Sequence, residues 1–423
     1  MSLPLEGIRV LDLSRLLPGG FCSLLLADFG ADVLKVEDTG MGDYIRWSPP
    51  YLEGADDSAK SALFLSLNRN KRSMRLDLKT EAGRETLLAL VRDADVVLES
   101  FRPGVLDRLG VGYERMREVN RGIVYCAISG YGQSGPKRDA SGHDMNYLGL
   151  VGLLGLTGER DGPPVQAAGQ IADLGGGALM AAFGIMLALR ERDGTPARAG
   201  HERRPGSGEG QIVDVSMADG ALSWLAMVAA AYFTDGVVPR RGDLPLAGSL
   251  ICYRPYECAD GWVTLGALEP KFWQAFCRGV RREDLIASQF EHPGSPAHEQ
   301  VCEIFRARTR AQWESFAREQ DCCLEPVLAL DEALDSELVQ AREMVVELDQ
   351  PGAVQPVRQL GIPIKLSRTP GDHARLPGPA LGEHTEQALR AAGYTEEQVA
   401  ELLAQGAAAG ASEPAPQGAS FRA

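Results

Sequence analysis

Residues 8–37 read IRVLDLSRLLPGGFCSLLLADFGADVLKVE, and this stretch decides the fold. Its first six residues, 8–13, predict a buried strand. Pro18-Gly-Gly then introduces an apolar helix from Phe21 to Phe29, which ends at Gly30, and residues 32–37 predict the next strand. A β-α-β unit of about thirty residues requires a parallel sheet, because two parallel strands need a crossover connection.

The same pattern repeats further along the chain. Residues 73–78 predict a strand, 80–92 a helix, 95–100 a strand and 122–129 another strand. We therefore expect the first 130 residues to form an α/β domain with an open, doubly wound, Rossmann-like parallel sheet. Ligands of such sheets lie beyond the carboxyl ends of the strands. Since no Gly-x-Gly-x-x-Gly follows the first strand, a nicotinamide or flavin interpretation is weak.

The length of 423 residues favours two domains. We expect a large α/β domain over residues 1–225, completed by residues 340–405. A smaller α+β domain is predicted over 235–335, around a hairpin whose strands are 250–257 and 262–266. Residues 406–423 are rich in Ala, Gly, Pro and Ser and predict a disordered tail.

Composition excludes several classes of function. A formal charge of −15 argues against general nucleic-acid binding, which needs a broad basic face. The eight cysteines contain no Cys-x-x-Cys pair, so neither a metal site nor a disulfide framework is expected. The start of the chain lacks a signal-peptide pattern, and the apolar stretches 178–189 and 221–233 fall short of a membrane span of ~20 residues. We expect a cytoplasmic protein with no metal, nucleic-acid or membrane partner.

Two candidate proton-transfer groups open two apolar segments. His143 stands in Gly142-His-Asp-Met, and Asp173 precedes three glycines, Gly175–Gly177. Helix N-termini stabilise negative charge, so this pairing suits removal of a proton from carbon and stabilisation of the resulting oxyanion. A structural histidine and an ordinary helix cap are the alternatives. The glycine run indicates close approach of the backbone to a ligand, and Glu269 follows a strand and precedes a helix that starts with proline.

A basic cluster precedes and enters the third predicted strand. Five of the eleven residues from 69 to 79 are Arg or Lys. This density predicts a phosphate-binding pocket, with a solvated loop as the alternative. Arg102 follows a strand at the edge where ligands of such sheets bind.

Nine ordered motifs of the chain resemble the family III CoA-transferase superfamily (CaiB/BaiF-like), and within it the α-methylacyl-CoA racemases, over residues 5–395. The motifs are 5–14, 27–37, 68–73, 102–105, 129–136, 210–220, 256–261, 266–272 and 382–385. The chain departs from the racemases at Gly169, where they carry asparagine. It also departs at Glu37-Asp-Thr, where many members carry a basic residue.

The resemblance implies the residues of the active site. His143, Asp144, Asp173 and Glu269 match the racemase pattern, whereas transferases keep the residue matching Asp173 and commonly lack the histidine. We therefore expect racemisation or epimerisation of 2-methylacyl-CoA thioesters by two-base 1,1-proton transfer through an enolate. His143 and Asp173 would face opposite sides of the α-carbon, Glu269 would orient His143, and the Asp144 backbone N–H would bind the oxyanion.

Two other functions stay open at this point. A family III CoA-transferase would move CoA between a thioester and a carboxylic acid through an aspartyl-CoA intermediate on Asp173. A CoA-thioester-binding protein with a decayed site is the third. In each case CoA is part of the ligand and no separate cofactor is expected. Its phosphates would be bound by Arg69, Asn70, Lys71, Arg72, Arg75 and Arg102.

The resemblance also implies the partner. The family fold predicts an interlocked homodimer of two ring-like chains. The segments 178–190 and 221–233 are apolar almost all round, which predicts burial on every side.

Overall fold

The computed structural model describes residues 2–54, 61–195 and 204–411. The chain divides into two compact units. The first comprises Met1–Val151, Ala168–Trp224 and Gln340–Ala423, and the second Gly152–Ala167 and Leu225–Val339. The division differs from the expected one mainly at residues 152–167, which belong to the second unit although they lie far from its other residues in sequence.

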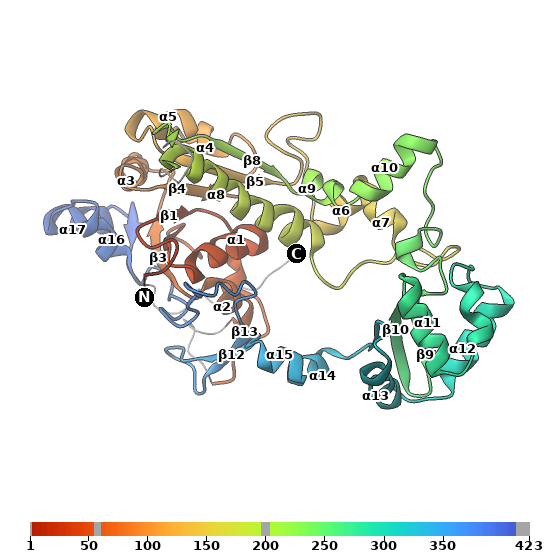
Figure 1. Ribbon diagram of the computed structural model, residues 1–423. Helices are drawn as coiled ribbons and strands as arrows, with labels where there is room; N and C mark the ends of the chain where they lie inside the picture. Colours follow the sequence, from red (N-terminus) through yellow and green to blue (C-terminus); the bar gives the residue numbers. More distant parts are fainter. Residues whose placement is uncertain (1, 55–60, 196–203, 412–423) are drawn as a thin grey trace. The chain divides into compact units, whose positions relative to one another are not determined.

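A seven-stranded sheet forms the centre of the first unit (Figure 1). Its strand order is β14-β3-β2-β1-β4-β5-β8, and every neighbouring pair is parallel except β14 with β3. The strands are β1 (Arg9–Asp12), β2 (Asp32–Glu37), β3 (Lys71–Leu76), β4 (Val96–Glu99), β5 (Val124–Ser129), β8 (Ile212–Ser216) and β14 (Ala408–Ala409). The predicted doubly wound α/β sheet is confirmed.

Helices pack on both faces of this sheet. One core lies between the strands and the helices α3, α5, α16 and α17, and contains Leu11, Leu34 and Leu76. The helical segments before the middle of the chain are α1 (Leu16–Asp28), η1 (Tyr44–Trp47), α2 (Ala62–Asn68), α3 (Glu81–Val91), α4 (Val105–Arg108), α5 (Tyr113–Val119) and α6 (Asp144–Leu150). The later ones are η3 (Ile171–Leu179), α8 (Met180–Asp193), α9 (Met217–Ser223), α16 (Thr385–Ala391) and α17 (Glu396–Ala404). Two two-stranded antiparallel sheets complete the unit, β6 (Gly194–Thr195) with β7 (Arg204–Pro205), and β12 (Val345–Leu348) with β13 (Val357–Leu360).

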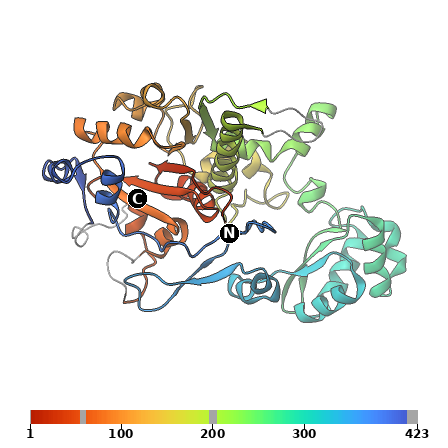
Figure 2. The same cartoon turned by 60° about the vertical axis from the view of Figure 1, so that its left-hand side comes forward.

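The end of the described chain is ordered further than the composition predicts. β14 pairs with β3, and Ala407 and Ala408 are buried in the core beside α17. Both views place α16 and α17 next to β3 (Figure 1, Figure 2). The predicted disorder from residue 406 therefore does not hold for 406–411, because alanine side chains fit between a helix and a sheet edge. Residues 412–423 lie outside the described residues.

The η3–α8 segment is a continuous helical stretch, Ile171–Asp193, longer than the predicted apolar stretch. Its 23 residues and mean hydropathy of 1.7 would allow a membrane crossing by length and composition, a test that core helices also pass. Gly175–Ala178 and Ile185 are buried, whereas Phe183 and Leu187 are exposed. The predicted apolar stretch begins at residue 178 because glycine disfavours helices. In the structure the helical segment also includes Gly175–Gly177.

The second unit contains a three-stranded antiparallel sheet, ordered β11-β10-β9. The predicted hairpin is formed by β9 (Tyr253–Cys258) and β10 (Gly261–Gly266), and β11 (Leu324–Pro326) adds to it. Its aromatic core includes Trp273, Phe305 and Trp313. The helical segments are α7 (Leu153–Leu156), α10 (Ala226–Asp235), η4 (Pro245–Ala247), α11 (Pro270–Gly279), η5 (Glu283–Ser288), α12 (Pro296–Arg306), α13 (Arg310–Gln320) and α14 (Leu330–Asp335), and α15 (Glu337–Ala341) contains the unit boundary.

Candidate active site

A cavity of about 870 Å³ lies at the carboxyl edge of the parallel sheet. The segments at the carboxyl ends of β1, β4 and β5 contribute residues 15–18, 100–103 and 128–131 to its wall. His143 and Asp173 line the same cavity. Parallel strands present the N-termini of their following helices at this edge, so the position suits an anionic or polarised ligand.

Asp173 lies in η3, whose wide π-helical turns are a feature often found at functional sites. Its side chain is half-buried. The pKa of Asp173 is raised to about 6, chiefly by burial and also by the nearby Asp144 carboxylate, while His143 acts in the opposite direction. Among the described residues no hydrogen bond to the Asp173 carboxylate is present. The group is thus a carboxyl with a pKa of about 6 in the wall of an open cavity, as expected of a functional site.

Asp144 connects the starts of the two helical segments. Its buried Oδ1 accepts hydrogen bonds from the backbone N–H groups of Ala172 (2.6 Å) and Asp173 (3.0 Å). Oxyanion binding by the Asp144 backbone N–H, the role expected of this residue from sequence, stays a prediction. The structure adds this side-chain role, which sequence could not supply because the two partners are 28 and 29 residues away.

His143 is the N-cap residue of α6 and is exposed. Its backbone N–H donates to Asn146 Oδ1 (3.0 Å), and the Asn146 N–H donates to the His143 carbonyl oxygen (2.8 Å). Tyr147 on the same helix donates its hydroxyl to the Gly142 carbonyl (2.5 Å). A Cβ on Gly142 would lie 2.7 Å from the Tyr147 ring. These contacts hold the backbone of His143, whose side chain lines the cavity.

The glycine run after Asp173 has a packing role that differs from the predicted one. A Cβ on Gly176 would lie 2.7 Å from the Met217 carbonyl oxygen and 2.8 Å from the Ala221 nitrogen. A Cβ on Gly175 would meet the Trp224 ring at 2.3 Å. The close neighbours therefore belong to α9 and the residue after it. The run lets two backbones approach each other, and Met217 is thereby held against the cavity.

Glu269 belongs to the second unit. It is exposed, and it is the residue from which α11 starts, with Pro270 in the first turn. Its carbonyl accepts from the N–H groups of Phe272 (3.0 Å) and Trp273 (3.3 Å). Its hydrogen bond to His143 stays a prediction.

The first three residues of the basic cluster are committed to internal partners. Arg69 pairs with Asp28 (2.7 Å), and both side chains are buried. Asn70 donates to Asp28 (2.9 Å) and to the Asp372 carbonyl (2.7 Å). Lys71 is fully buried, donates to the Gly20 carbonyl (2.9 Å) and has a pKa lowered to about 8 by burial. Their placement does not support the predicted phosphate contacts.

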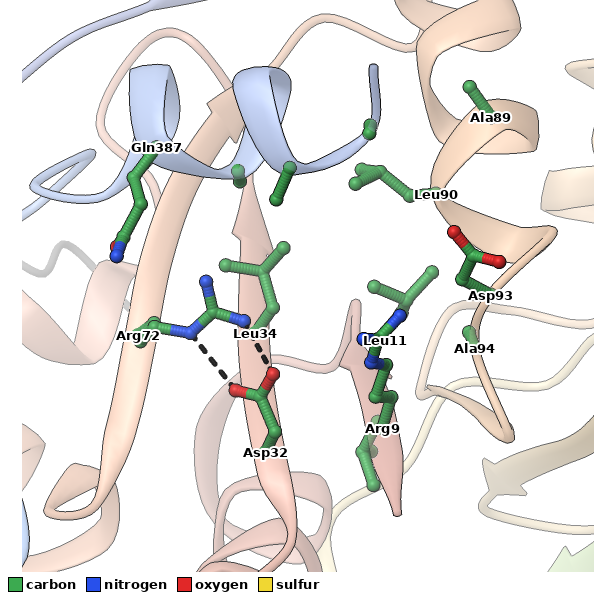
Figure 3. Close-up of a pocket in the computed structure, with 14 residues that line it drawn as sticks. Arg9, Leu11, Asp32, Leu34, Arg72, Ala89, Leu90, Asp93, Ala94 and Gln387 are labelled. Atoms are coloured by element: carbon green, nitrogen blue, oxygen red, sulfur yellow. Dashed lines mark hydrogen bonds and ion pairs between the residues drawn. The ribbon is translucent and has the colours of Figure 1, made fainter. Parts of the chain in front are cut away.

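Arg72 and Arg75 also lie outside the catalytic cavity. Arg72 pairs with Asp32 (2.8 Å) at the amino edge of the sheet, the opposite end from Asp173. There it lines a groove of about 360 Å³ between α3 and α16, whose floor includes Leu11 and Leu34 (Figure 3). Arg75 donates to backbone carbonyls of the loop after β2, including Gly40 (2.9 Å). Arg72 therefore lies at the other edge of the sheet, and Arg75 is bound to the loop after β2 outside the catalytic cavity.

Other cations occupy the ligand edge. Arg15, Arg102 and Arg138 line the catalytic cavity, and of these only Arg102 was selected from sequence. A neighbouring cavity of about 340 Å³ is lined by Lys79 and Arg108. Its apolar walls are Leu13, Val36, Leu76, Leu78, Phe101, Val105 and Leu109. Arg15 and Phe101 line both cavities. In the described ranges no group of three or more His, Cys, Asp and Glu side chains is arranged to hold a metal ion.

Known proteins share both the sequence and the fold. The family model of CoA-transferase family III matches residues 5–385. A succinyl-CoA:mesaconate CoA-transferase of Haloarcula marismortui is 36% identical over 92% of this chain and 96% of its own. The α-methylacyl-CoA racemase of Mus musculus is 34% identical over 94% and 96%. A CAIB/BAIF family protein from Brucella suis has 28% identity and a TM-score of 0.76 over 92% and 99%. The chain therefore belongs to CoA-transferase family III, whose members act on CoA thioesters as transferases or racemases.

Proposed function

We propose that this enzyme transfers CoA between a thioester and a free carboxylic acid, with Asp173 as the covalent nucleophile. The observation that carries the proposal is the Asp173 carboxylate, half-buried, without a hydrogen-bond donor among the described residues, and facing a cavity of about 870 Å³. Its pKa of about 6 leaves it ionised above that pH, and the absence of a donor leaves its oxygens available for attack. The name of the Haloarcula relative supports the transferase over the racemase.

The reaction balances without a metal or redox partner. An Asp173 oxygen attacks the thioester carbonyl and CoA leaves as thiolate, which gives a mixed anhydride between the acyl group and Asp173. The thiolate then attacks the Asp173 carbonyl carbon, the first carboxylic acid leaves, and the enzyme carries an aspartyl-CoA thioester. The incoming carboxylate reverses the two steps. The backbone N–H groups at the start of α6 are candidate donors to the oxyanions.

The CoA moiety needs contacts for its phosphates and its adenine. We assign the phosphates to Arg15, Arg102 and Arg138 in the catalytic cavity, and to Lys79 and Arg108 beside it. The apolar cavity of about 340 Å³ suits a planar base, with Phe101 between the two cavities. Arg15 is half-exposed and pairs with Asp38 (2.9 Å). It supplies a positive charge beside the acidic residues that follow β2.

Trapping tests the proposal. Enzyme incubated with succinyl-CoA and then with hydroxylamine should carry a hydroxamate on Asp173, found by peptide mass spectrometry, and Asp173→Asn should carry none. Relatives named for mesaconate and glutarate make these acids the first acceptors to assay. Turnover of the same substrates with no label on Asp173 would contradict the covalent mechanism.

Racemisation is the second candidate, because His143 lines the same cavity as Asp173. Two acid/base groups on one cavity would allow proton removal from one face of an α-carbon and return to the other. A single epimer of a 2-methylacyl-CoA in heavy water should then gain α-deuterium and lose optical purity. His143→Ala should reduce that exchange by about 10²-fold or more, whereas it should leave hydroxylamine trapping on Asp173 intact.

We also propose a second copy of this chain as the partner. In each unit large apolar side chains are exposed, including Phe183 (63%) and Leu187 (54%) on α8 and Phe233 (81%) on α10. These segments were predicted to be buried on every side, and a partner chain would cover them. Sedimentation at low micromolar concentration should reveal a dimer that is lost together with activity. An active monomer would contradict this proposal.

A further inference from the structure

Leu16 has a backbone conformation that leucine rarely adopts. Its φ is +61°, in the left-handed region that suits glycine, because Cβ approaches the backbone there. Leu16 and Leu17 are half-buried, and both line the cavity that contains Asp173. A strained residue in the wall of a catalytic cavity points to a function that outweighs the strain.

Side chains from four different segments hold the backbone of Ser14, Arg15 and Leu16. The Ser14 N–H donates to Asp12 Oδ1 (2.9 Å), the Ser14 carbonyl accepts from Lys35 Nζ (2.9 Å), the Arg15 N–H donates to Ser100 Oγ (3.1 Å), and the Leu16 N–H donates to the Asp43 carboxylate (3.2 and 3.3 Å). Consecutive backbone groups are thus fixed from outside the loop. Such over-determination is what a strained conformation requires to persist.

The contact to Leu16 depends on a buried ion pair. Lys35 Nζ lies 3.0 Å from Asp43 Oδ2, and both side chains are fully buried. Asp43 also accepts the Ile45 N–H (3.2 Å), and Lys35 also binds Ser14. The pair therefore fixes both ends of the three-residue turn. Neither charge has access to solvent or to the cavity, so the pair can act on a substrate only through the turn.

We propose that Asp43 and Lys35 are positioning residues, which hold Leu16 against the bound acyl group so that this side chain sets discrimination among acyl groups. The inference rests on the proposed function, because the acyl carbonyl must lie at Asp173. The apolar wall formed by Leu16 and Leu17 then lies beside the reacting group. Its placement selects for the size and branching of the acyl group, whereas the CoA phosphates contact the arginines elsewhere.

Leu16→Gly tests the strain and the contact together. Leu16 packs against the buried cluster that includes Ile45 and Phe64, so any small replacement loses this contact. Only glycine adopts this φ without penalty, so Leu16→Gly should unfold at a higher temperature than Leu16→Ala. We expect the ratio of kcat/KM for isobutyryl-CoA to that for acetyl-CoA to change at least fivefold, about 1 kcal/mol. The dissociation constant of free CoA, measured by calorimetry, should stay unchanged. An unfolding temperature below that of Leu16→Ala, or an unchanged ratio, would overturn the proposal.

The double variant Lys35→Met with Asp43→Asn tests the positioning. Removing both charges avoids an unpaired buried ion. The ratio of kcat/KM for the two esters should shift in the same direction as in Leu16→Gly, through a change in KM for the acyl-CoA. The matched control is Arg69→Met with Asp28→Asn, because that pair is equally buried but does not line the cavity. Equal shifts of the ratio in both double variants would mean that the loss of any buried ion pair has this effect, and the proposal would be overturned.

A wild-type enzyme that transfers CoA neither from these two esters nor from succinyl-CoA would refute the proposed function instead. In that event the unfolding temperatures of Leu16→Gly and Leu16→Ala still decide whether the turn is strained.

Discussion

Asp173 should cost the folded protein stability whenever it is ionised, and asparagine at this position should remove that cost. The pKa of Asp173 rises from 3.8 to about 6 on folding, chiefly through burial. One pKa unit corresponds to about 1.4 kcal/mol, so the full shift corresponds to about 3 kcal/mol. Because the side chain is partly exposed, solvent screening reduces this to about 2 kcal/mol.

The sign of the pH dependence follows from the direction of the shift. The folded protein binds the Asp173 proton more tightly than the unfolded chain, so its stability falls as pH rises between the two pKa values. The cost is absent below about pH 4 and complete above about pH 6. Since no hydrogen bond to this carboxylate occurs among the described residues, Asp173→Asn loses no partner. We expect it to be inactive, yet more stable than the wild type by about 2 kcal/mol at neutral pH.

Urea unfolding at a fixed protein concentration, repeated from about pH 4 to about pH 8, measures the effect. The stability difference should vanish at the acid end and reach its plateau above about pH 6. Asp161→Asn is the control for the substitution itself, because Asp161 is exposed and does not line the cavity. A stability gain that does not depend on pH, or a less stable Asp173→Asn at neutral pH, would refute the reasoning.

The remaining predictions concern the contacts around this carboxylate and the ligand edge. Asp144→Ala should destabilise the protein by about 2–4 kcal/mol, because two backbone N–H groups lose a charged acceptor. Hydrogen exchange of the Ala172 and Asp173 amides should become faster, and unchanged exchange would contradict this role. Gly176→Ala should cost about 1–3 kcal/mol in urea unfolding, because its Cβ would press on the α9 backbone. Gly169→Ala should cost little stability, because a Cβ there would lie in open space. Equal losses of stability in the two variants would argue against the packing role of Gly176. Arg102→Ala should raise KM for the acyl-CoA about tenfold in steady-state kinetics, as expected for a lost charge-assisted bond. Arg72→Ala should leave KM for the acyl-CoA unchanged. A raised KM in Arg72→Ala together with an unchanged KM in Arg102→Ala would instead identify the basic cluster as the phosphate site.

Much of the fold was determined by local sequence. The predicted strand 32–37 coincides with β2. The strand contains three β-branched or leucine side chains, Val33, Leu34 and Val36, and Gly30 separates it from the preceding helix. The hairpin of β9 and β10 follows equally from its two short strands and the turn at 259–261. Boundaries were less accurate where polar residues are buried. β3 starts at Lys71, two residues before the predicted start, because internal partners satisfy the Lys71 charge.

The candidate site was predictable only as residue types. His143 and Asp173 were selected by chemistry and by glycine, and the structure brings both to one cavity. The basic cluster was misread because sequence reports a charge without its neighbours. Arg69 meets Asp28, 41 residues earlier, and this pairing exists only once α2 packs beside α1. The cations of the ligand edge, Arg15 and Arg138, lie outside the nine ordered motifs and the basic cluster, so neither was selected from sequence.

The sequence by itself determined the parallel sheet, because hydrophobic periodicity and turn residues act over a few positions. It also determined which side chains can exchange protons or attack a thioester. Only the tertiary structure decided which charges face a ligand and which neutralise one another. It alone gave Asp173 its raised pKa and Leu16 its strained backbone, because burial and long-range hydrogen bonds depend on segments that meet only after folding.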